Sequence, residues 1–384
     1  MVNNWDRIRE ISSNLRGLTF IGVSDIVASG ISALFWFYMA SLLGTENYGH
    51  VSYFLSIAGI ASTLSLLGAE NTISVYTPKN VRLESTIFFV VLISAVIAAS
   101  VTYFLFYDYR ISIYILGAVM FGLVASEIVA RGLYSSYSKY LITQKVLMVA
   151  FGIGLYYAIG VDGIILGLGI SFFPYVIRIV KEFRASVIDL SLLKPRIGFM
   201  ANSYILNIAS AFSGSVDKLI IAPMVGFALL GNYQLGIQFL AVLQIIPSIV
   251  YKYILPQDAG GNPNKKLKQA IILISIGIAG LGIVLSPIVI PMAFPKFSEA
   301  IQIIQIMSVS VVATTINLTY TSKFLGNERI KIIIVSSGIY IGILTSSIIL
   351  LGMTFGINGM ATALVLATFA ETIFFYVMNK LKRD

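Results

Sequence analysis

The stretch that decides the fold is FMANSYILNIASAFSGSVDKLIIAPMVGFALLGNYQLG, residues 199–236. It is apolar enough to cross a bilayer, yet small or polar residues recur along it at spacings of three and four: Ser203, Asn207, Ser210, Gly214 and Asp217. These spacings align the five residues on one face of a helix. A polar group in hydrocarbon is costly unless it faces a partner helix or a water-filled cavity. The stripe therefore indicates a transmembrane helix that borders a transport path or a closely packed neighbour.

The composition of the whole chain agrees with a membrane protein. Of its 384 residues, 58% are hydrophobic and 11% are charged, whereas a typical soluble domain contains about 25% charged residues. The chain has no cysteine and a single histidine, His50, which argues against disulfides, thiolate chemistry and histidine-rich metal sites. We therefore expect a polytopic, all-α membrane protein without a metal or another cofactor.

Apolar runs long enough to cross a bilayer predict twelve transmembrane helices. They cover residues 18–43, 48–75, 85–107, 111–135, 140–159, 162–182, 199–224, 228–254, 269–293, 299–324, 330–353 and 356–379. Most lysines and arginines fall in segments on the N-terminal side, and the opposite segments hold only Arg110 and Lys296. Because cytoplasmic segments retain basic residues, both termini are predicted to be cytoplasmic, in the plasma membrane. The net charge of +9 is thus a topology signal and does not indicate a nucleic-acid partner.

Two glycine patterns recur in the same order in both halves of the chain. Leu42-Leu43-Gly44 with Gly49 matches Met224-Val225-Gly226 with Gly231, and Gly160-Val161-Asp162-Gly163 matches Gly356-Ile357-Asn358-Gly359. The repeats predict two parallel, pseudosymmetric halves of six helices each, residues 1–182 and 199–384. The cytoplasmic linker between them, residues 183–198, has the apolar positions and basic flanks of a helix lying on the inner membrane surface.

Two short motifs carry a resemblance to a known family. The first hairpin reads Leu43-Gly44-Thr45-Glu46-Asn47-Tyr48-Gly49, and the seventh span carries Asp217-Lys218-Leu219-Ile220-Ile221 followed by Gly226, Gly231 and Tyr233. In these motifs the chain resembles the polysaccharide transporter branch of the multidrug, oligosaccharidyl-lipid and polysaccharide exporter superfamily. Relatives that flip peptidoglycan precursors line their cavity with arginines from the first two spans. The equivalent interior here has no arginine, which argues against a simple arginine clamp on a diphosphate.

The resemblance implies an alternating-access flippase that moves a lipid-linked oligosaccharide across the cytoplasmic membrane for surface polysaccharide or glycan assembly. Its two halves would form a V open to the cytoplasm and rock to open outward. The implied partners are the lipid-linked sugar, membrane lipids, and glycosyltransferases or a polymerase of the same pathway. A cation- or proton-coupled exporter of the multidrug branch is the alternative. A membrane enzyme is disfavoured, because no loop contains an acid–base cluster.

Seven polar residues are candidates for the wall of the substrate cavity. They are Ser203, Asn207, Ser210 and Asp217 of the seventh span, Gln234 and Gln238 of the eighth, and Asn317 of the tenth. Their side chains suit hydrogen bonding to sugar hydroxyls, and hydrogen bonding between helices is the alternative. Lys218 follows Asp217 by about 100° of helix rotation, so the two are not expected to share a face. Lys218 is expected either to line the path or to snorkel to the headgroups.

Two further hypotheses concern acidic residues inside the spans. Asp25 is the candidate for ion coupling, because an ionisable group inside a span is functional by default; the alternative is a carboxylate that reaches cytoplasmic water. Glu127 and Arg131, four residues apart, are expected to form a salt bridge, either structural or a gate.

Basic residues near the cytoplasmic ends of the spans are candidates for initial capture of a phosphate headgroup. They are Lys145, Arg178 and Lys323. Glu371 is expected to pair with one of them. Superposing the halves at an offset of 182 residues places Phe35 opposite Asp217, so the two halves are predicted to play unequal roles.

Overall fold

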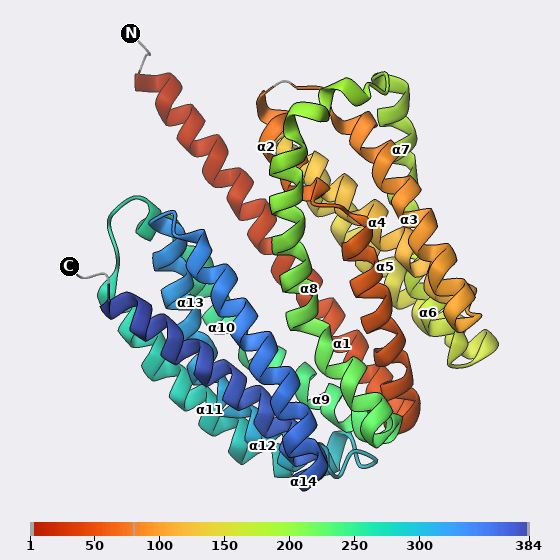
Figure 1. Cartoon of the computed structure of the whole chain (residues 1–384), viewed down its shortest axis with the longest axis vertical. Helices are drawn as coiled ribbons and strands as arrows, with labels where there is room; N and C mark the ends of the chain where they lie inside the picture. Colours follow the sequence, from red (N-terminus) through yellow and green to blue (C-terminus); the bar gives the residue numbers. More distant parts are fainter. Residues whose placement is uncertain (1–3, 80, 382–384) are drawn as a thin grey trace. The chain divides into compact units, whose positions relative to one another are not determined.

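The structure is a computed structural model that describes residues 4–79 and 81–381, with side chains from residue 22 onward (Figure 1). These residues form helices and turns without a strand. Within this part of the chain, nine helices are long and apolar enough to cross a membrane, and ten if the bent pair α9 and α10 counts as one span. The prediction of an all-α polytopic membrane protein is confirmed.

The helices follow one another with short connections. In chain order they are α1 (Asn4–Ser65), α2 (Ala69–Tyr76), α3 (Glu84–Phe106), α4 (Tyr109–Ala130), α5 (Tyr134–Ile159), α6 (Asp162–Ile170), α7 (Phe173–Ala185), α8 (Ile197–Val225), α9 (Phe227–Leu243), α10 (Ile245–Ala259), α11 (Lys265–Ala293), α12 (Ala300–Ser308), α13 (Ser310–Gly326) and α14 (Ile330–Lys380). Three 3₁₀ turns lie at Thr77–Lys79, Leu190–Leu192 and Lys194–Arg196.

Two long helices each contain a pair of spans. Gly44 breaks α1 with φ 72° and ψ −178°, and Gly356 breaks α14 with φ 59° and ψ −142°. Positive φ is accessible to glycine at little cost, so the chain reverses there. Each arm has at least about 20 residues and is therefore at least about 30 Å long, which suffices for a bilayer. With both helices divided at these glycines, the described residues contain the twelve spans that the sequence predicts.

Several predicted spans are broken in the structure. The second ends at Ser65, and a turn with Leu67 and Gly68 at positive φ precedes the short helix α2. A Cβ at Gly68 would lie 2.3 Å from the carbonyl oxygen of Met200, so the turn exists where the chain passes close to α8. The eighth span bends by 47° between α9 and α10. The continuous helix predicted over 48–75 is therefore wrong, because hydropathy does not report such turns.

The linker does not form the interfacial helix that its composition suggests. After α7 ends, Ser186 is extended and the chain continues through two 3₁₀ turns. Asp189 accepts a hydrogen bond from the backbone N–H of Ser191 at 2.9 Å, and Thr86 bonds both the N–H and the C=O of Asp189. Pro195 also removes a helix donor. The contacts within the linker and those with α3 are thus formed in place of a continuous helix.

The described residues fall into two compact units. The first comprises the chain up to Phe35 and Ile57–Ile208, and the second comprises Trp36–Ser56 and the chain from Ala209 onward. The hairpin around Gly44 thus groups with the second half, and the beginning of α8 groups with the first. The division into residues 1–182, 183–198 and 199–384 remains a prediction from the repeats.

Equivalent glycines make equivalent contacts, as expected of pseudosymmetric halves. In the second unit, a Cβ on Gly49 would lie 1.9 Å from the carbonyl oxygen of Phe227, and one on Gly231 would lie 1.9 Å from that of Thr45. The chain segments that follow Gly44 and Gly226 therefore cross with their backbones in contact. Gly49 lies at the crossing on one segment, and Gly231 lies there on the other. Likewise, a Cβ on Gly163 would meet the carbonyl of Leu155, and one on Gly359 that of Leu351, both at 2.1 Å.

Candidate functional site

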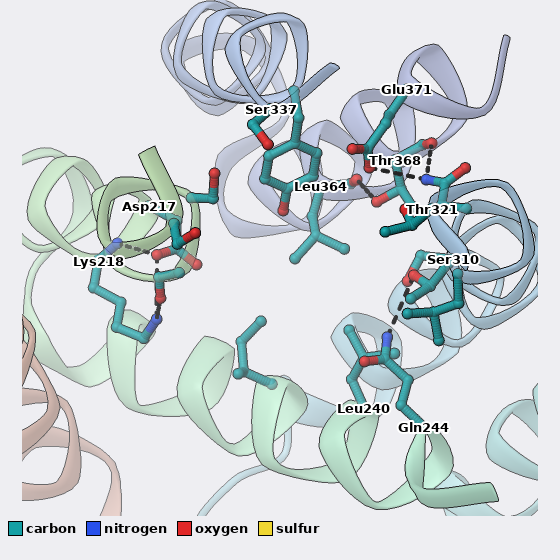
Figure 2. A pocket seen from close by; sticks show the side chains of 18 residues that line it. Asp217, Lys218, Leu240, Gln244, Ser310, Thr321, Ser337, Leu364, Thr368 and Glu371 are labelled. Carbon is teal, nitrogen blue, oxygen red and sulfur yellow. Dashed lines mark hydrogen bonds and ion pairs between the residues drawn. The ribbon is translucent and has the colours of Figure 1, made fainter. Parts of the chain in front are cut away.

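A cavity of about 550 Å³ lies in the second unit, between α8, α9, α13 and both arms of α14 (Figure 2). Figure 2 shows Asp217 and Lys218 on one side and Thr368 and Glu371 on the other. Hydroxyl and amide side chains dominate the polar part of its lining: Ser210, Ser213, Gln244, Ser310, Thr314, Asn317, Thr321, Ser337, Tyr340 and Thr368. Leucines and an isoleucine supply the apolar part. The cavity therefore offers many neutral hydrogen-bonding groups between apolar patches.

One side of the cavity carries a buried, compensated charge pair. Asp217 is 4% exposed, and its Oδ2 accepts a hydrogen bond from the Tyr233 hydroxyl at 3.0 Å. The Nζ of Lys218 lies 3.2 Å from Asp217 Oδ1 and donates to the carbonyl of Gly214 at 2.9 Å. The expectation that the two charges do not meet is wrong, because the long lysine side chain folds back along its helix. A buried carboxylate requires such partners.

The other side carries a carboxylate held by neutral donors. Glu371 accepts hydrogen bonds from Asn317 Nδ2 at 2.9 Å and from the Ser336 hydroxyl at 3.0 Å. Asn317 is itself fixed by Thr372, whose hydroxyl donates to its Oδ1 at 2.7 Å. The expected pairing of Glu371 with a cytoplasmic lysine or arginine is therefore replaced by an amide and a hydroxyl. With Lys218 committed to Asp217, the lining carries about one net negative charge.

The structure divides the predicted stripe of α8 between the two units. Ser210 and Asp217 line the cavity of the second unit. Ser203 is buried against the Gly68 turn of the first unit. Asn207, also in the first unit, accepts a hydrogen bond from Asn71 at 3.4 Å. A helical face read from the sequence thus has two different environments along its length.

The remaining predicted cavity residues lie at three places. Asn317 lines the main cavity, and Gln234 lines a smaller cavity of about 220 Å³. Gln238 is half-buried on α9. Gln244 and Tyr340 also line the main cavity, and the sequence does not predict them as lining residues. Gln244 is a single glutamine near Pro247, and Tyr340 lies in an apolar arm of α14, so neither belongs to a periodic polar pattern. In the structure, Gln244 donates a hydrogen bond to Thr314 at 3.4 Å.

The first unit contains an ionic cluster beside a cavity of about 630 Å³, which Glu84, Arg131 and Glu182 help to line. The predicted Glu127–Arg131 bridge is present, with Arg131 Nε 2.5 Å from Glu127 Oε1. Arg178 also contacts Glu127, at 2.9 Å, and Arg131 contacts Glu182 at 2.6 Å and Glu84 at 3.5 Å. Glu127 is fully buried. Three glutamates and two arginines from α3, α4 and α7 therefore interact, with one carboxylate more than there are guanidinium groups, and the guanidinium of Arg178 is already held by carboxylates.

The other predicted charged residues are dispersed. Asp25 accepts a hydrogen bond from the Tyr137 hydroxyl at 3.1 Å, which ties α1 to α5 in the first unit. Lys145 is half-buried on α5. Lys323 lies in the second unit and donates to Asn379 at 2.5 Å. Neither the coupling role of Asp25 nor the capture role of the lysines is tested by these contacts, and both stay hypotheses.

No protein-family model matches the sequence, and no curated protein matches it either. Solved structures do match over nearly the whole chain. The lipid II flippase MurJ in an inward closed conformation has a TM-score of 0.80 at 12% identity, over 94% of this chain and 87% of that one.

Two transporter structures are similar as well. An inward-facing multidrug resistance MATE family transporter of the MOP superfamily has a TM-score of 0.73 at 11% identity, over 95% of this chain and 98% of that one. A mutant of the Vibrio cholerae MATE transporter VcmN has a TM-score of 0.63 at 13% identity, over 97% and 99%. Identities this low compare folds only. The resemblance expected from the motifs is confirmed at that level: the chain has the polytopic helical fold shared by the lipid II flippase MurJ and the MATE transporters.

Proposed function

We propose that the protein is an alternating-access flippase that moves a lipid-linked oligosaccharide across the cytoplasmic membrane, with both termini in the cytoplasm. The observation that carries the proposal is the chemistry of the cavity in the second unit. Its volume of about 550 Å³ falls within the range of about 300–1,000 Å³ usual for small-molecule sites. The sugar part of the substrate would occupy it while the lipid tail stays in the bilayer.

The lining suits a carbohydrate because each sugar hydroxyl both donates and accepts a hydrogen bond. Serine and threonine hydroxyls do the same, and Gln244 and Asn317 add amide groups. Leu240 and Leu364 provide apolar surface for the C–H faces of sugar rings. No arginine is among the lining residues, so this cavity recognises hydroxyls and does not clamp a diphosphate. The fold likeness to a lipid II flippase supports the same substrate class.

A cation- or proton-coupled small-molecule exporter is the second candidate. Glu371 favours it, because a carboxylate held only by neutral donors attracts a cation in a low-dielectric cavity. The likeness to MATE transporters is equally consistent with it. Asp25 is the corresponding candidate in the first unit.

Reconstitution separates the two candidates. The purified chain is placed in liposomes that contain a fluorescent lipid-linked oligosaccharide from the source organism, and a membrane-impermeant quencher reports the label exposed outside. We expect chain-dependent transfer to the outer leaflet, reduced at least about tenfold by Asn317→Leu, which removes polar groups from the cavity wall. Transfer no faster than in empty liposomes would reject the flippase. Chain-dependent efflux of a lipophilic cation from the same liposomes would then favour the exporter.

The same proposal has a cellular consequence. A deletion strain should accumulate its lipid-linked sugar on the inner leaflet and lose surface glycan. Normal surface glycan in the deletant, with no second flippase, would contradict the function. Glycosyltransferases or a polymerase acting on the same glycan are the partners that this function requires.

A further inference from the structure

A second, smaller cavity of about 220 Å³ in the second unit has a chemistry of its own. Trp36 is the one aromatic residue of its lining, and the remainder consists of three serines, Leu55, Gly214, Lys218 and Gln234. Gly214 and Lys218 also line the larger cavity, so they stand at the boundary of both. The volume lies below that of usual drug-sized sites, so the space suits a single ring.

The lining of this cavity includes positions that are equivalent in the two sequence repeats. At the repeat offset of 182 residues, Trp36 corresponds to Lys218 and Ser52 corresponds to Gln234. All four residues line the cavity. Two pairs of equivalent positions therefore border one space. Each pair carries two different chemical groups, so the lining is asymmetric.

One lining atom requires a hydrogen-bond partner that the described residues do not supply. Gln234 Oε1 is buried and accepts no hydrogen bond from them. An unsatisfied buried acceptor costs about 1–3 kcal/mol, so a water or a ligand hydroxyl is expected there. The indole of Trp36 is steadied by Tyr48, whose ring packs edge-on at 6.2 Å. A pyranose can satisfy both groups. Its C–H groups can pack on the indole ring, and one of its hydroxyls can donate a hydrogen bond to the amide oxygen.

We propose that this smaller cavity is a monosaccharide subsite, in which Trp36 stacks on the apolar face of a sugar ring and Gln234 accepts a hydrogen bond from its hydroxyl. The proposal rests on the flippase function and names the part of the path that recognises one sugar residue. Lys218, held by Asp217 and by the Gly214 carbonyl, forms the threshold between this subsite and the larger cavity. A sugar that moves between the two spaces passes that threshold.

Tryptophan fluorescence tests the subsite without any transport. The sequence contains two tryptophans, Trp5 and Trp36, so Trp5→Phe leaves Trp36 as the sole indole. The purified variant is titrated in detergent with the methyl glycosides of glucose, galactose, mannose, rhamnose and N-acetylglucosamine. We expect a saturable change in Trp36 emission with at least one glycoside. Gln234→Leu should weaken that affinity about tenfold through the lost hydrogen bond.

Two further variants serve as controls for this titration. Gln269→Leu is the matched control, because Gln269 is exposed on α11, and its affinity should equal that of the parent. Gln234→Met keeps the side-chain length without the acceptor and replaces Gln234→Leu if the latter fails to fold, as judged by size-exclusion chromatography. An affinity unchanged by loss of the amide would overturn the subsite.

The glycoside titration and the liposome assay can each give a negative result independently of the other. Sugar binding without lipid transfer would retain the subsite and reject the flippase. Transfer without a saturable change in Trp36 emission from any glycoside would retain the flippase and reject the subsite. A saturable change with tetraphenylphosphonium and none with the glycosides would also reject the subsite, because the cavity would then select a cation.

Discussion

Alanine at either crossing glycine of the second unit should destabilise the protein strongly. A Cβ on Gly49 or on Gly231 would lie 1.9 Å from a backbone carbonyl oxygen of the other hairpin, whereas real Cβ contacts stay beyond 3.0 Å. The two hairpins would have to separate by at least about 1 Å. Overpacking of this kind typically costs about 1–3 kcal/mol. The obstacle is backbone and cannot rotate away, so we expect a cost at the upper end, about 3 kcal/mol.

The assay is thermal unfolding of the purified variants in detergent, followed by size-exclusion chromatography or light scattering. At about 2 °C per kcal/mol for a large chain, Gly49→Ala and Gly231→Ala should each lower the apparent melting temperature by about 5 °C or more. Gly277→Ala is the control. A Cβ on Gly277 meets nothing within 4 Å on α11, so its replacement should leave stability equal or raise it by up to about 1 kcal/mol.

The double variant tests whether the two glycines permit the same close contact between the hairpins. If one separation of the hairpins relieves both clashes, Gly49→Ala combined with Gly231→Ala should cost less than the two single costs together, because the sites are coupled. Full additivity would mean that the glycines act separately. Single variants as stable as the parent would refute the close crossing itself.

Three further predictions concern charged residues. Asp217→Ala should abolish transfer in the liposome assay, because it leaves a buried lysine without its carboxylate, while Ser210→Ala is tolerated; the reverse pattern would contradict the role assigned to Asp217. Glu127→Gln should lower the free energy of unfolding by about 3–5 kcal/mol, since two arginines lose a buried partner. Glu84 lies 3.5 Å from Arg131, so Glu84→Gln should cost clearly less in the same melting assay. Glu371→Gln should fold normally and keep sugar transfer within about twofold, since hydroxyl recognition needs no charge; loss of lipophilic-cation efflux in this variant would instead support an exporter.

The hairpins could be predicted from the sequence because their signal is local. Gly44, Gly160, Gly226 and Gly356 recur in matched positions, and each has a positive φ, between 59° and 87°. Only glycine adopts this conformation freely, so the turn is encoded at one position. The spans between the hairpins follow from hydropathy for the same reason.

The candidate site could be predicted only in part, because its contacts join residues far apart in the chain. The spacing of the polar residues predicts one polar face on α8, but periodicity does not tell which stretch of a helix meets which unit. Glu371 and Asn317 are 54 residues apart, and Arg178 and Glu127 are 51 apart. Such pairs depend on how helices pack, which composition does not specify. Gln234 was selected as a polar residue, while its position beside Trp36 emerges only from the structure.

The repeat makes the inequality of the halves a physical requirement. Phe35, at the position equivalent to Asp217, is 3% exposed, and a Cβ on Gly152 would lie 2.8 Å from its ring. A buried carboxylate is stable only with partners, and Asp217 has Tyr233 and Lys218. The positions equivalent to these two partners hold Val51, whose side chain has no hydrogen-bond donor, and Trp36, whose indole carries no charge. An aspartate at position 35 would thus be unsupported, and an aromatic residue fills the space instead. The buried charge pair of the second half therefore has no counterpart at the equivalent positions of the first half.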